Sequence, residues 1–214
     1  MEFQDFVDGM RRIGATHDEL KKLIHMSGWD EFSKFEDAPW FVLWYVIYAR
    51  CGRIPELESI IALDAEAAYE YASGVLRARF PQGEPAISRD PWRAYEYARC
   101  MVRGRWPEGE SIISSHPDWA CLYARNILQH RWPEAEPAIA QSPQWAYCYA
   151  RDVIGGPWPE AEPRIAGHPW SACYYARDII RGRWPEAEPV IARNPEAAYY
   201  YDHAVCRSTN LQRD

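Results

Sequence analysis

The sequence from Arg131 to Pro157, RWPEAEPAIAQSPQWAYCYARDVIGGP, is the most regular unit of a repeat, and variants of it fill the chain from residue 28 onward. Its anchor is an aromatic or aliphatic residue followed by proline, and this pair returns every 26 residues without an insertion. A fixed period of about 20 to 50 residues is the signature of stacked repeats, in which each repeat contacts only its neighbours. The anchors are Ile54-Pro55, Phe80-Pro81, Trp106-Pro107, Trp132-Pro133, Trp158-Pro159 and Trp184-Pro185.

Three further positions keep the same register in each repeat. Isoleucine follows the anchor by seven residues, alanine by fourteen and tyrosine by seventeen, as in Ile139, Ala146 and Tyr149. We therefore predict an all-α fold, an α-solenoid of about seven two-helix repeats of 26 residues with an N-terminal helical cap.

Each half of the repeat has its own helix signals. The first half, PEAEPAIA, carries two prolines four residues apart, so we expect a turn or a single 3₁₀ turn before a short helix. The second half predicts a helix of about 12 residues, because a capping residue precedes a proline that suits the first helical position. The capping pairs are Asp90-Pro91, His116-Pro117, Ser142-Pro143, His168-Pro169 and Asn194-Pro195. Left-handed helix ends are expected at the glycines that follow, Gly52, Gly104, Gly156 and Gly182.

The register divides the chain into four segments. The N-terminal segment lies outside the register, carries a capping box from Thr16 to Glu19, and is expected to shield the apolar end of the stack. The next segment is a degenerate repeat, in which Gly28 stands at the anchor position. The segments are 1–27, a helical cap; 28–53, a degenerate repeat; 54–209, six full repeats; and 210–214, a C-terminal tail.

The composition favours a large aromatic core in a chain without a membrane span. Hydrophobic residues make up 48% of the sequence, and eleven Trp and fourteen Tyr are enough for a continuous core. The six cysteines include no CxxC pair and fall mostly in predicted helices, which favours buried or half-buried thiols in a reducing compartment over disulfides or a zinc site. No signal-peptide core and no apolar run of 18 residues occurs. We expect a soluble protein in the cytoplasm, with no membrane partner.

Charge is mixed along the repeats. The formal charge of −7 arises from 31 acidic and 24 basic residues that are not gathered into blocks. Because no basic stripe is evident, a usual nucleic-acid-binding protein is disfavoured. An acidic face that imitates nucleic acid stays open as an alternative.

The phrases GRWPEAEP at 182–189 and YARDII at 175–180 resemble short helical repeats of about this length, RWPEAE…YAR, in proteins of tailed phages and prophages. The resemblance covers residues 54 to 209 and implies a helical-repeat fold and a phage origin. It supplies no catalytic residues, because such proteins mostly lack an assigned activity. A weaker likeness connects the chain to leucine-rich-variant repeats. Trp stands in place of leucine and the N-terminal cysteine cluster is missing, so that likeness implies architecture only.

One arginine per repeat recurs on the outer side of the second helix. Guanidinium groups on packed helices would stand about 9 to 10 Å apart and could bind phosphates or carboxylates of a partner. The alternative is that each arginine pairs with the recurring glutamates of its own or an adjacent repeat. The arginines are Arg99, Arg125, Arg151 and Arg177.

No part of the sequence predicts catalysis, a cofactor or a metal site. The glutamate pairs of the PEAEP phrase recur in nearly every full repeat, whereas a catalytic site is a single asymmetric set of groups. His116 and His168 occupy helix-cap positions, and HExxH, GxSxG and a glycine-rich phosphate loop do not occur. We therefore expect a protein that is not an enzyme.

The positions where the repeat varies are the most informative about function. Sixteen residues after the anchor the series is acidic early and aromatic late, ending in Tyr174 and Tyr200, and Trp170 shares the face of Tyr174. Exposed aromatic residues near arginine are typical of interface hot spots. The alternative is that neighbouring helices cover them. A second departure is Gly155-Gly156-Pro157, where the usual Arg-Gly-Arg is lost and the stack could bend.

These observations favour a non-catalytic repeat protein that binds another macromolecule. The expected partner-binding residues are Trp170, Tyr174, Tyr200, Arg99, Arg125, Arg151 and Arg177. With the phage resemblance, we expect the partner to be a host protein, such as a defence or regulatory complex that is inhibited. The alternative function is mimicry or binding of nucleic acid. The sequence leaves the oligomeric state open.

Overall fold

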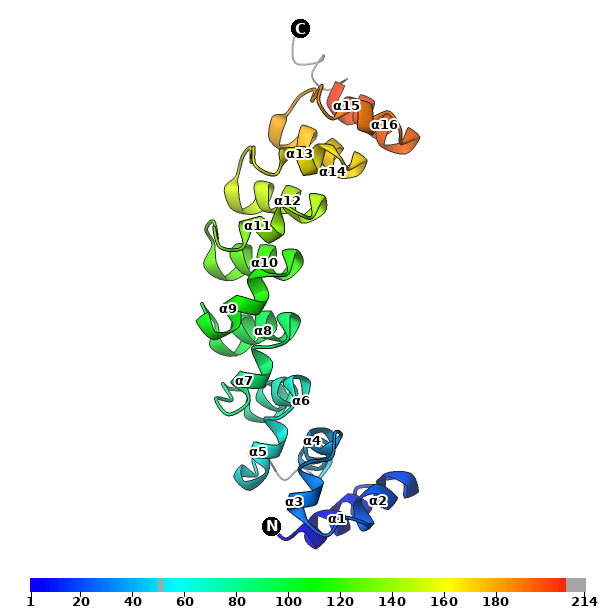
Figure 1. The fold of residues 1–214 in the computed structure, drawn as a ribbon, viewed down its shortest axis with the longest axis vertical. Coiled ribbons are helices and arrows are strands. Elements are labelled where there is room, and N and C mark those ends of the chain that lie inside the picture. Colours follow the sequence, from blue (N-terminus) through cyan, green and yellow to red (C-terminus); the bar gives the residue numbers. More distant parts are fainter. Residues whose placement is uncertain (50–51, 207–214) are drawn as a thin grey trace. The chain divides into compact units, whose positions relative to one another are not determined.

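The computed structural model describes residues 1–49 and 52–206, and within these ranges every regular element is helical (Figure 1). The prediction of an all-α helical-repeat fold is confirmed. The chain divides into two compact units, Met1–Ile112 and Ile113–Asp214, which are called unit 1 and unit 2 below. The predicted tail, 210–214, and Cys51 lie outside the described residues.

The N-terminal segment forms helices α1 (Phe3–Arg12) and α2 (His17–Ile24) before the short helix α3 (Trp29–Phe32). The capping box is present: the Thr16 hydroxyl accepts a hydrogen bond from the Glu19 N–H at 3.3 Å, and Glu19 accepts one from the Thr16 N–H at 2.7 Å. The rings of Phe6 and Phe32 are buried and lie 5.3 Å apart, so the N-terminal segment packs against the degenerate repeat through aromatic side chains.

Each repeat contains a short helix followed by a second helix, as predicted. The short helices are α5 (Glu58–Ile61), α7 (Glu84–Ile87), α9 (Pro107–Ser114), α11 (Glu136–Ile139), α13 (Glu162–Ala166) and α15 (Glu188–Ile191), with a 3₁₀ turn at Pro55–Leu57. The second helices are α4 (Ala38–Tyr48), α6 (Ala65–Glu70), α8 (Pro91–Tyr97), α10 (Pro117–Tyr123), α12 (Pro143–Tyr149), α14 (Pro169–Tyr175) and α16 (Pro195–Tyr201).

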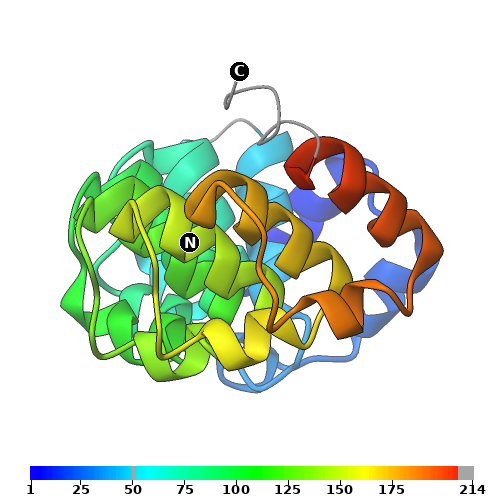
Figure 2. The same cartoon turned by 90° about the horizontal axis from the view of Figure 1, so that it is seen from above.

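Second helices of adjacent repeats contact each other within each unit. In unit 1, α6 lies between α4 and α8; in unit 2, α10, α12, α14 and α16 follow one another (Figures 1 and 2). The five predicted proline starts are all confirmed. The caps at Asp90, His168 and Asn194 also accept a hydrogen bond from a backbone N–H of the first turn, which satisfies a donor that the helix leaves free.

Every second helix from α6 onward continues into a π-helical turn, which the sequence did not predict. These turns are Tyr71–Leu76, Ala98–Val102, Ala124–Leu128, Ala150–Ile154, Ala176–Ile180 and Asp202–Cys206. The first five end on a residue in the left-handed conformation, Arg77, Arg103, Gln129, Gly155 and Arg181, with φ between 52° and 73°.

The expected left-handed glycines are therefore wrong at three of four positions. Gly52 has φ of 68°, but Gly104, Gly156 and Gly182 each follow the left-handed residue. The reason is the π-helical turn, in which a cap N–H reaches five residues back, as from Gly155 to the Ala150 carbonyl at 2.9 Å. This geometry ends the helix one residue earlier than expected.

Tyrosines and tryptophans join consecutive repeats in the core. Tyr149 is fully buried; its hydroxyl accepts a hydrogen bond from the Trp132 N–H at 2.6 Å, while its ring lies 5.1 Å from Trp158 of the next repeat. The same ring contact recurs at 5.0 to 5.1 Å in Tyr71–Phe80, Tyr97–Trp106, Tyr123–Trp132 and Tyr175–Trp184. Tyr71, Tyr97, Tyr149 and Tyr175 therefore each bind their own repeat through the hydroxyl oxygen and the next repeat through the ring.

A polar clamp completes the contact of Tyr149. The Tyr149 hydroxyl donates to Glu136 at 3.1 Å, and Arg131 donates two hydrogen bonds to the same carboxylate, each at 2.8 Å. The hydrogen bonds from Arg131 lower the pKa of Glu136, despite its partial burial. The Glu–Arg pair recurs in unit 1 at Glu58–Arg53, Glu84–Arg79 and Glu110–Arg105, and in unit 2 at Glu188–Arg183.

Candidate functional site

The candidate site lies on the outer face of the second helices of unit 2. Its side chains come from helices α12, α14 and α16 and from the π-helical turns that follow α10, α12 and α14. We call it the aromatic–arginine surface and define it as Arg125, Tyr147, Arg151, Asp152, Trp170, Tyr174, Arg177, Asp178 and Tyr200.

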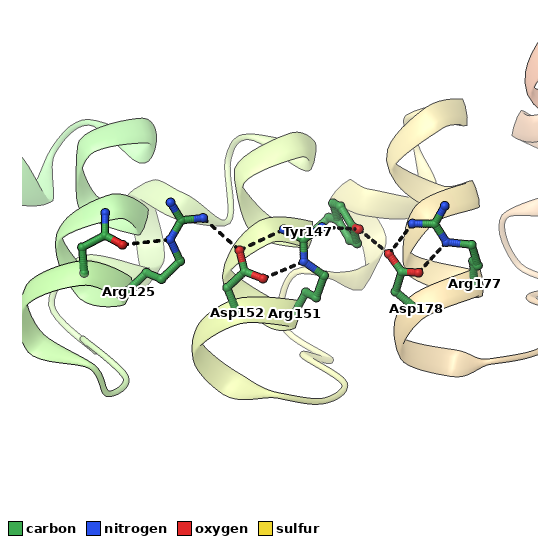
Figure 3. A network of polar contacts seen from close by, with 7 residues as sticks. Arg125, Tyr147, Arg151, Asp152, Arg177 and Asp178 are labelled. Carbon is green, nitrogen blue, oxygen red and sulfur yellow. Dashed lines mark hydrogen bonds and ion pairs between the residues drawn. The ribbon is translucent and has the colours of Figure 1, made fainter.

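A chain of polar contacts crosses three repeats of this surface (Figure 3). Arg125 binds Asp152 of the next repeat at 3.1 Å, and Arg151 binds the same carboxylate at 2.6 Å. Arg151 also donates to the Tyr147 hydroxyl at 2.8 Å, and that hydroxyl in turn donates to Asp178 of the following repeat. The contacts therefore fix neighbouring repeats to each other at the surface as well as in the core.

The polar contacts shift the pKa values of the two aspartates and of Tyr147. Hydrogen bonds from Arg151 lower the pKa of Asp152, and those from Arg177 lower the pKa of Asp178, although partial burial opposes both changes. Burial and the hydrogen bond to Asp178 raise the pKa of Tyr147 to about 12. Both aspartates are therefore charged and the tyrosine is protonated at neutral pH.

Three aromatic rings meet at one end of this row of polar contacts. The ring centroids of Trp170, Tyr174 and Tyr200 lie 5.5 to 6.0 Å from one another, in tilted or edge-on arrangements. All three side chains are only half-buried, so neighbouring helices cover part of each ring and leave the rest exposed. Such offset and edge-on pairs are the favoured contacts of aromatic rings.

Arg177 holds this aromatic cluster in place. Its guanidinium lies 5.3 Å from the centroid of Tyr174 and 5.8 Å from that of Tyr200, within the range of a cation–π contact. It also donates to the Tyr200 hydroxyl and to Asp178. The rings are therefore fixed before any partner arrives.

The structure brings six of the seven predicted partner-binding residues onto one surface. Trp170, Tyr174 and Tyr200 contact one another, and Arg177 contacts the two tyrosines. Arg125 and Arg151 lie along the row of polar contacts, and both groups belong to unit 2. Arg99 belongs to unit 1 and pairs with Glu96 at 2.6 Å. That these residues bind a partner stays a prediction.

The alternative pairing that the sequence suggested for these arginines is wrong. We expected them to pair, if not with a partner, with the recurring glutamates, but Arg99 pairs with Glu96 of its own helix and the other three pair with Asp152 or Asp178. In every full repeat except the one that begins at Trp158, the arginine just before the anchor instead binds the glutamate five residues after it. That arginine donates two hydrogen bonds to the carboxylate of the glutamate.

Sequence reasoning missed Tyr147, Asp152 and Asp178. Tyr147 is only 5% exposed, yet its hydroxyl joins two repeats, and its ring lies 5.9 Å from Tyr174. A signal existed for the aspartates, because Arg-Asp follows Tyr-Ala in two consecutive repeats. Their partners stand up to 31 positions away, which no local pattern shows.

A second exposed aromatic stripe lies on α4 in unit 1. Trp40, Ile47 and Tyr48 are 39%, 46% and 63% exposed, and the rings of Trp44 and Tyr48 lie 5.7 Å apart. Counted from Gly28 as the anchor, these residues occupy the same repeat positions as the outer face of unit 2. Trp92 of α8 is likewise 43% exposed at the position that Trp170 holds in its own repeat.

The cysteines and the possible metal ligands are the other candidate functional groups of the chain. Cys121 and Cys173 are buried and Cys100 and Cys148 half-buried, as expected, and burial raises the pKa of Cys121 to about 12 and that of Cys173 to about 11. Among the residues that the structure describes, no group of three or more His, Cys, Asp or Glu side chains could hold a metal ion.

Comparison with family models, curated proteins and solved structures gives no match to this chain. Within residues 1–49 and 52–206, no helix combines the length and the apolar character needed to cross a bilayer.

Proposed function

We propose that the protein is a non-catalytic binding module and that the aromatic–arginine surface of unit 2 binds a protein partner. The observation that carries this proposal is the cluster of three half-exposed rings, Trp170, Tyr174 and Tyr200, with Arg177 packed against two of them. Trp, Tyr and Arg are the residue types that dominate the binding energy of protein interfaces.

The arrangement also limits the cost of binding. Ordering a mobile side chain at an interface costs about 0.5 to 1.5 kcal/mol. Here Arg177 already binds Asp178 and Tyr200, so the rings lose little freedom when a partner covers them. Arg125, Arg151 and Arg177 already form ion pairs with aspartates of the same polypeptide. The proposal therefore assigns recognition to the aromatic faces, with the guanidinium groups as their support.

The identity of the partner rests on the resemblance to phage repeat proteins. On that basis we propose a bacterial host protein as the partner, with inhibition of a defence or regulatory complex as the consequence. An extended rigid surface suits this role, because repeat proteins present large preformed faces.

The test is capture of a partner from bacterial lysate by the tagged full-length protein, followed by measurement of its affinity. Trp170→Ala combined with Tyr200→Ala should weaken binding about 30-fold or more, the effect of losing a hot spot. Trp92→Ala is the matched control, because it removes the same residue type at the same repeat position in unit 1. Equal binding by all three proteins, with native helix content, would refute the proposal.

A second candidate function is mimicry of nucleic acid, and one specific observation favours it. The first glutamate of each pair is exposed, and among the described residues none of them forms an ion pair: Glu56, Glu108, Glu134, Glu160 and Glu186. If this acidic edge imitates phosphates, DNA will displace the captured partner and Glu134→Gln with Glu160→Gln will weaken capture. If the aromatic–arginine surface is the binding site, neither DNA nor these two substitutions will affect capture of the partner.

A further inference from the structure

The repeat that begins at Trp158 lacks one member of the polar clamp. In the five other full repeats, an arginine just before the anchor donates to the carboxylate of the corresponding glutamate, at 2.7 to 3.2 Å. Here Pro157 occupies that position, and the corresponding carboxylate belongs to Glu162. Glu162 accepts a hydrogen bond from Tyr175 at 2.9 Å but forms no ion pair with any described residue.

The backbone around Pro157 is the same as in the repeat that keeps its arginine. Gly155 is left-handed with φ of 73°, as Arg181 is with 55°, and the N–H two residues before each anchor reaches the helix at 3.2 Å in both. The Trp158 N–H still binds the Tyr175 hydroxyl at 2.8 Å. The sequence change expected to bend the stack therefore leaves the local turn intact and removes only the guanidinium.

Glu162 lines a groove of unit 2. Pro159, Pro163, Ala166 and Trp184 supply apolar walls, and Glu162 and Glu186 supply two carboxylates. In unit 1 a groove beside the corresponding glutamate, Glu58, is lined by Arg53 and Arg79. The unit 2 groove thus has the carboxylate of the clamp and an apolar wall, but no cation of its own among its lining residues.

We propose that this groove binds an arginine side chain of a protein partner, whose guanidinium takes the position that Arg131 and Arg183 fill in the neighbouring repeats. The aliphatic stem of arginine suits the proline and tryptophan walls, and the planar guanidinium suits a bidentate contact with a carboxylate. The site goes beyond the proposed function, because none of its residues belongs to the aromatic–arginine surface. Failure of one proposal leaves the other standing.

The test uses N-acetyl-L-arginine methylamide as the probe and the ¹⁵N-labelled full-length protein in an NMR titration. A single partly exposed guanidinium–carboxylate contact is weak, so we expect saturable shifts with a Kd on the order of 1 mM or weaker. The shifting amides should be those of residues 158–166 and 184–186. The corresponding lysine methylamide should bind several-fold less tightly, because ammonium lacks the planar fork.

Four variants decide the outcome. Pro157→Arg fills the position from within the chain and should abolish the shifts without lowering the melting temperature, and Glu162→Gln should reduce the affinity at least about fivefold. Glu136→Gln, in a clamp already filled by Arg131, should change nothing at this groove. Arg131→Pro should create a second set of shifts around Glu136. Unchanged probe binding in Pro157→Arg, or no saturable shift in the wild-type protein, would overturn the proposal.

Discussion

Tyr149 acts on two repeats at once. Its hydroxyl accepts from the Trp132 N–H and donates to Glu136, and its ring packs against Trp158. A buried N–H without an acceptor costs about 1 to 3 kcal/mol, more than a typical exposed ion pair contributes. At the scale of single residues, the tyrosine hydroxyls of the clamps therefore stabilise the fold more than the surface ion pairs do.

Tyr149→Phe should lower the free energy of unfolding by about 1 to 3 kcal/mol, because it leaves the Trp132 N–H buried without its acceptor. Urea denaturation measures the change. Tyr199→Phe is the control: Tyr199 is 67% exposed, so its loss should stay within about 0.5 kcal/mol. Losses of equal size would show that the hydroxyl contact is not what stabilises the repeat.

The lowered pKa of Asp178 predicts a pH dependence. Arg177 favours the charged carboxylate in the folded state, so the carboxylate stabilises the fold above its unfolded pKa of about 3.9, and this contribution is lost as the pH falls through the folded pKa. The free energy of unfolding of wild type minus that of Asp178→Asn should be constant from about pH 7 to 5 and shrink below about pH 4. A difference that does not change down to about pH 3 would contradict this assignment.

At the scale of elements, the second helix and its ending were predictable to different degrees. The five proline starts and the short helix before each were predicted correctly, because a cap residue and proline act locally. The π-helical turn was not predicted, because Ala-Arg-Asp-Val-Ile at Ala150–Ile154 suits an ordinary α-helix equally well. Packing of the turn against the adjacent repeat, which sequence spacing does not encode, accompanies this geometry.

The left-handed helix ends make a stability prediction. Arg181 has φ of 55°, a conformation that costs a residue with Cβ about 1 kcal/mol or more relative to glycine. Arg181→Gly should therefore raise the free energy of unfolding by about 0.5 to 1 kcal/mol, even though glycine gains entropy in the unfolded chain.

Gly182→Ala provides the matched control for that substitution. Gly182 has no positive φ, and no atom outside its own neighbourhood in the chain lies within 4 Å of an added Cβ, so the change should be neutral or slightly stabilising. Thermal and urea denaturation compare the two variants. Destabilisation by both Arg181→Gly and Gly182→Ala would contradict this assignment, because it would place the left-handed residue at position 182.

At the scale of the whole molecule, the sequence was enough for the architecture and for most of the candidate site. Periodicity predicts repeats because each one meets the same surroundings, and the departures from it at Trp170, Tyr174 and Tyr200 converge in space. What the sequence could not supply is contact between repeats. The polar chain through Tyr147 and Asp178, and the missing guanidinium at Glu162, depend on which side chains the fold brings together.

The central claim, that the aromatic–arginine surface binds a protein partner, is tested most directly by site-specific photo-crosslinking in bacterial lysate. A photoreactive phenylalanine derivative at Gln144, an exposed residue of α12 beside the surface, should give one discrete adduct, and Trp170→Ala in the same chain should remove it. The same derivative at Gln82, an exposed residue of unit 1, is the control and should give no such adduct. An adduct from Gln82 alone, or one from Gln144 that persists with Trp170→Ala, would contradict the account.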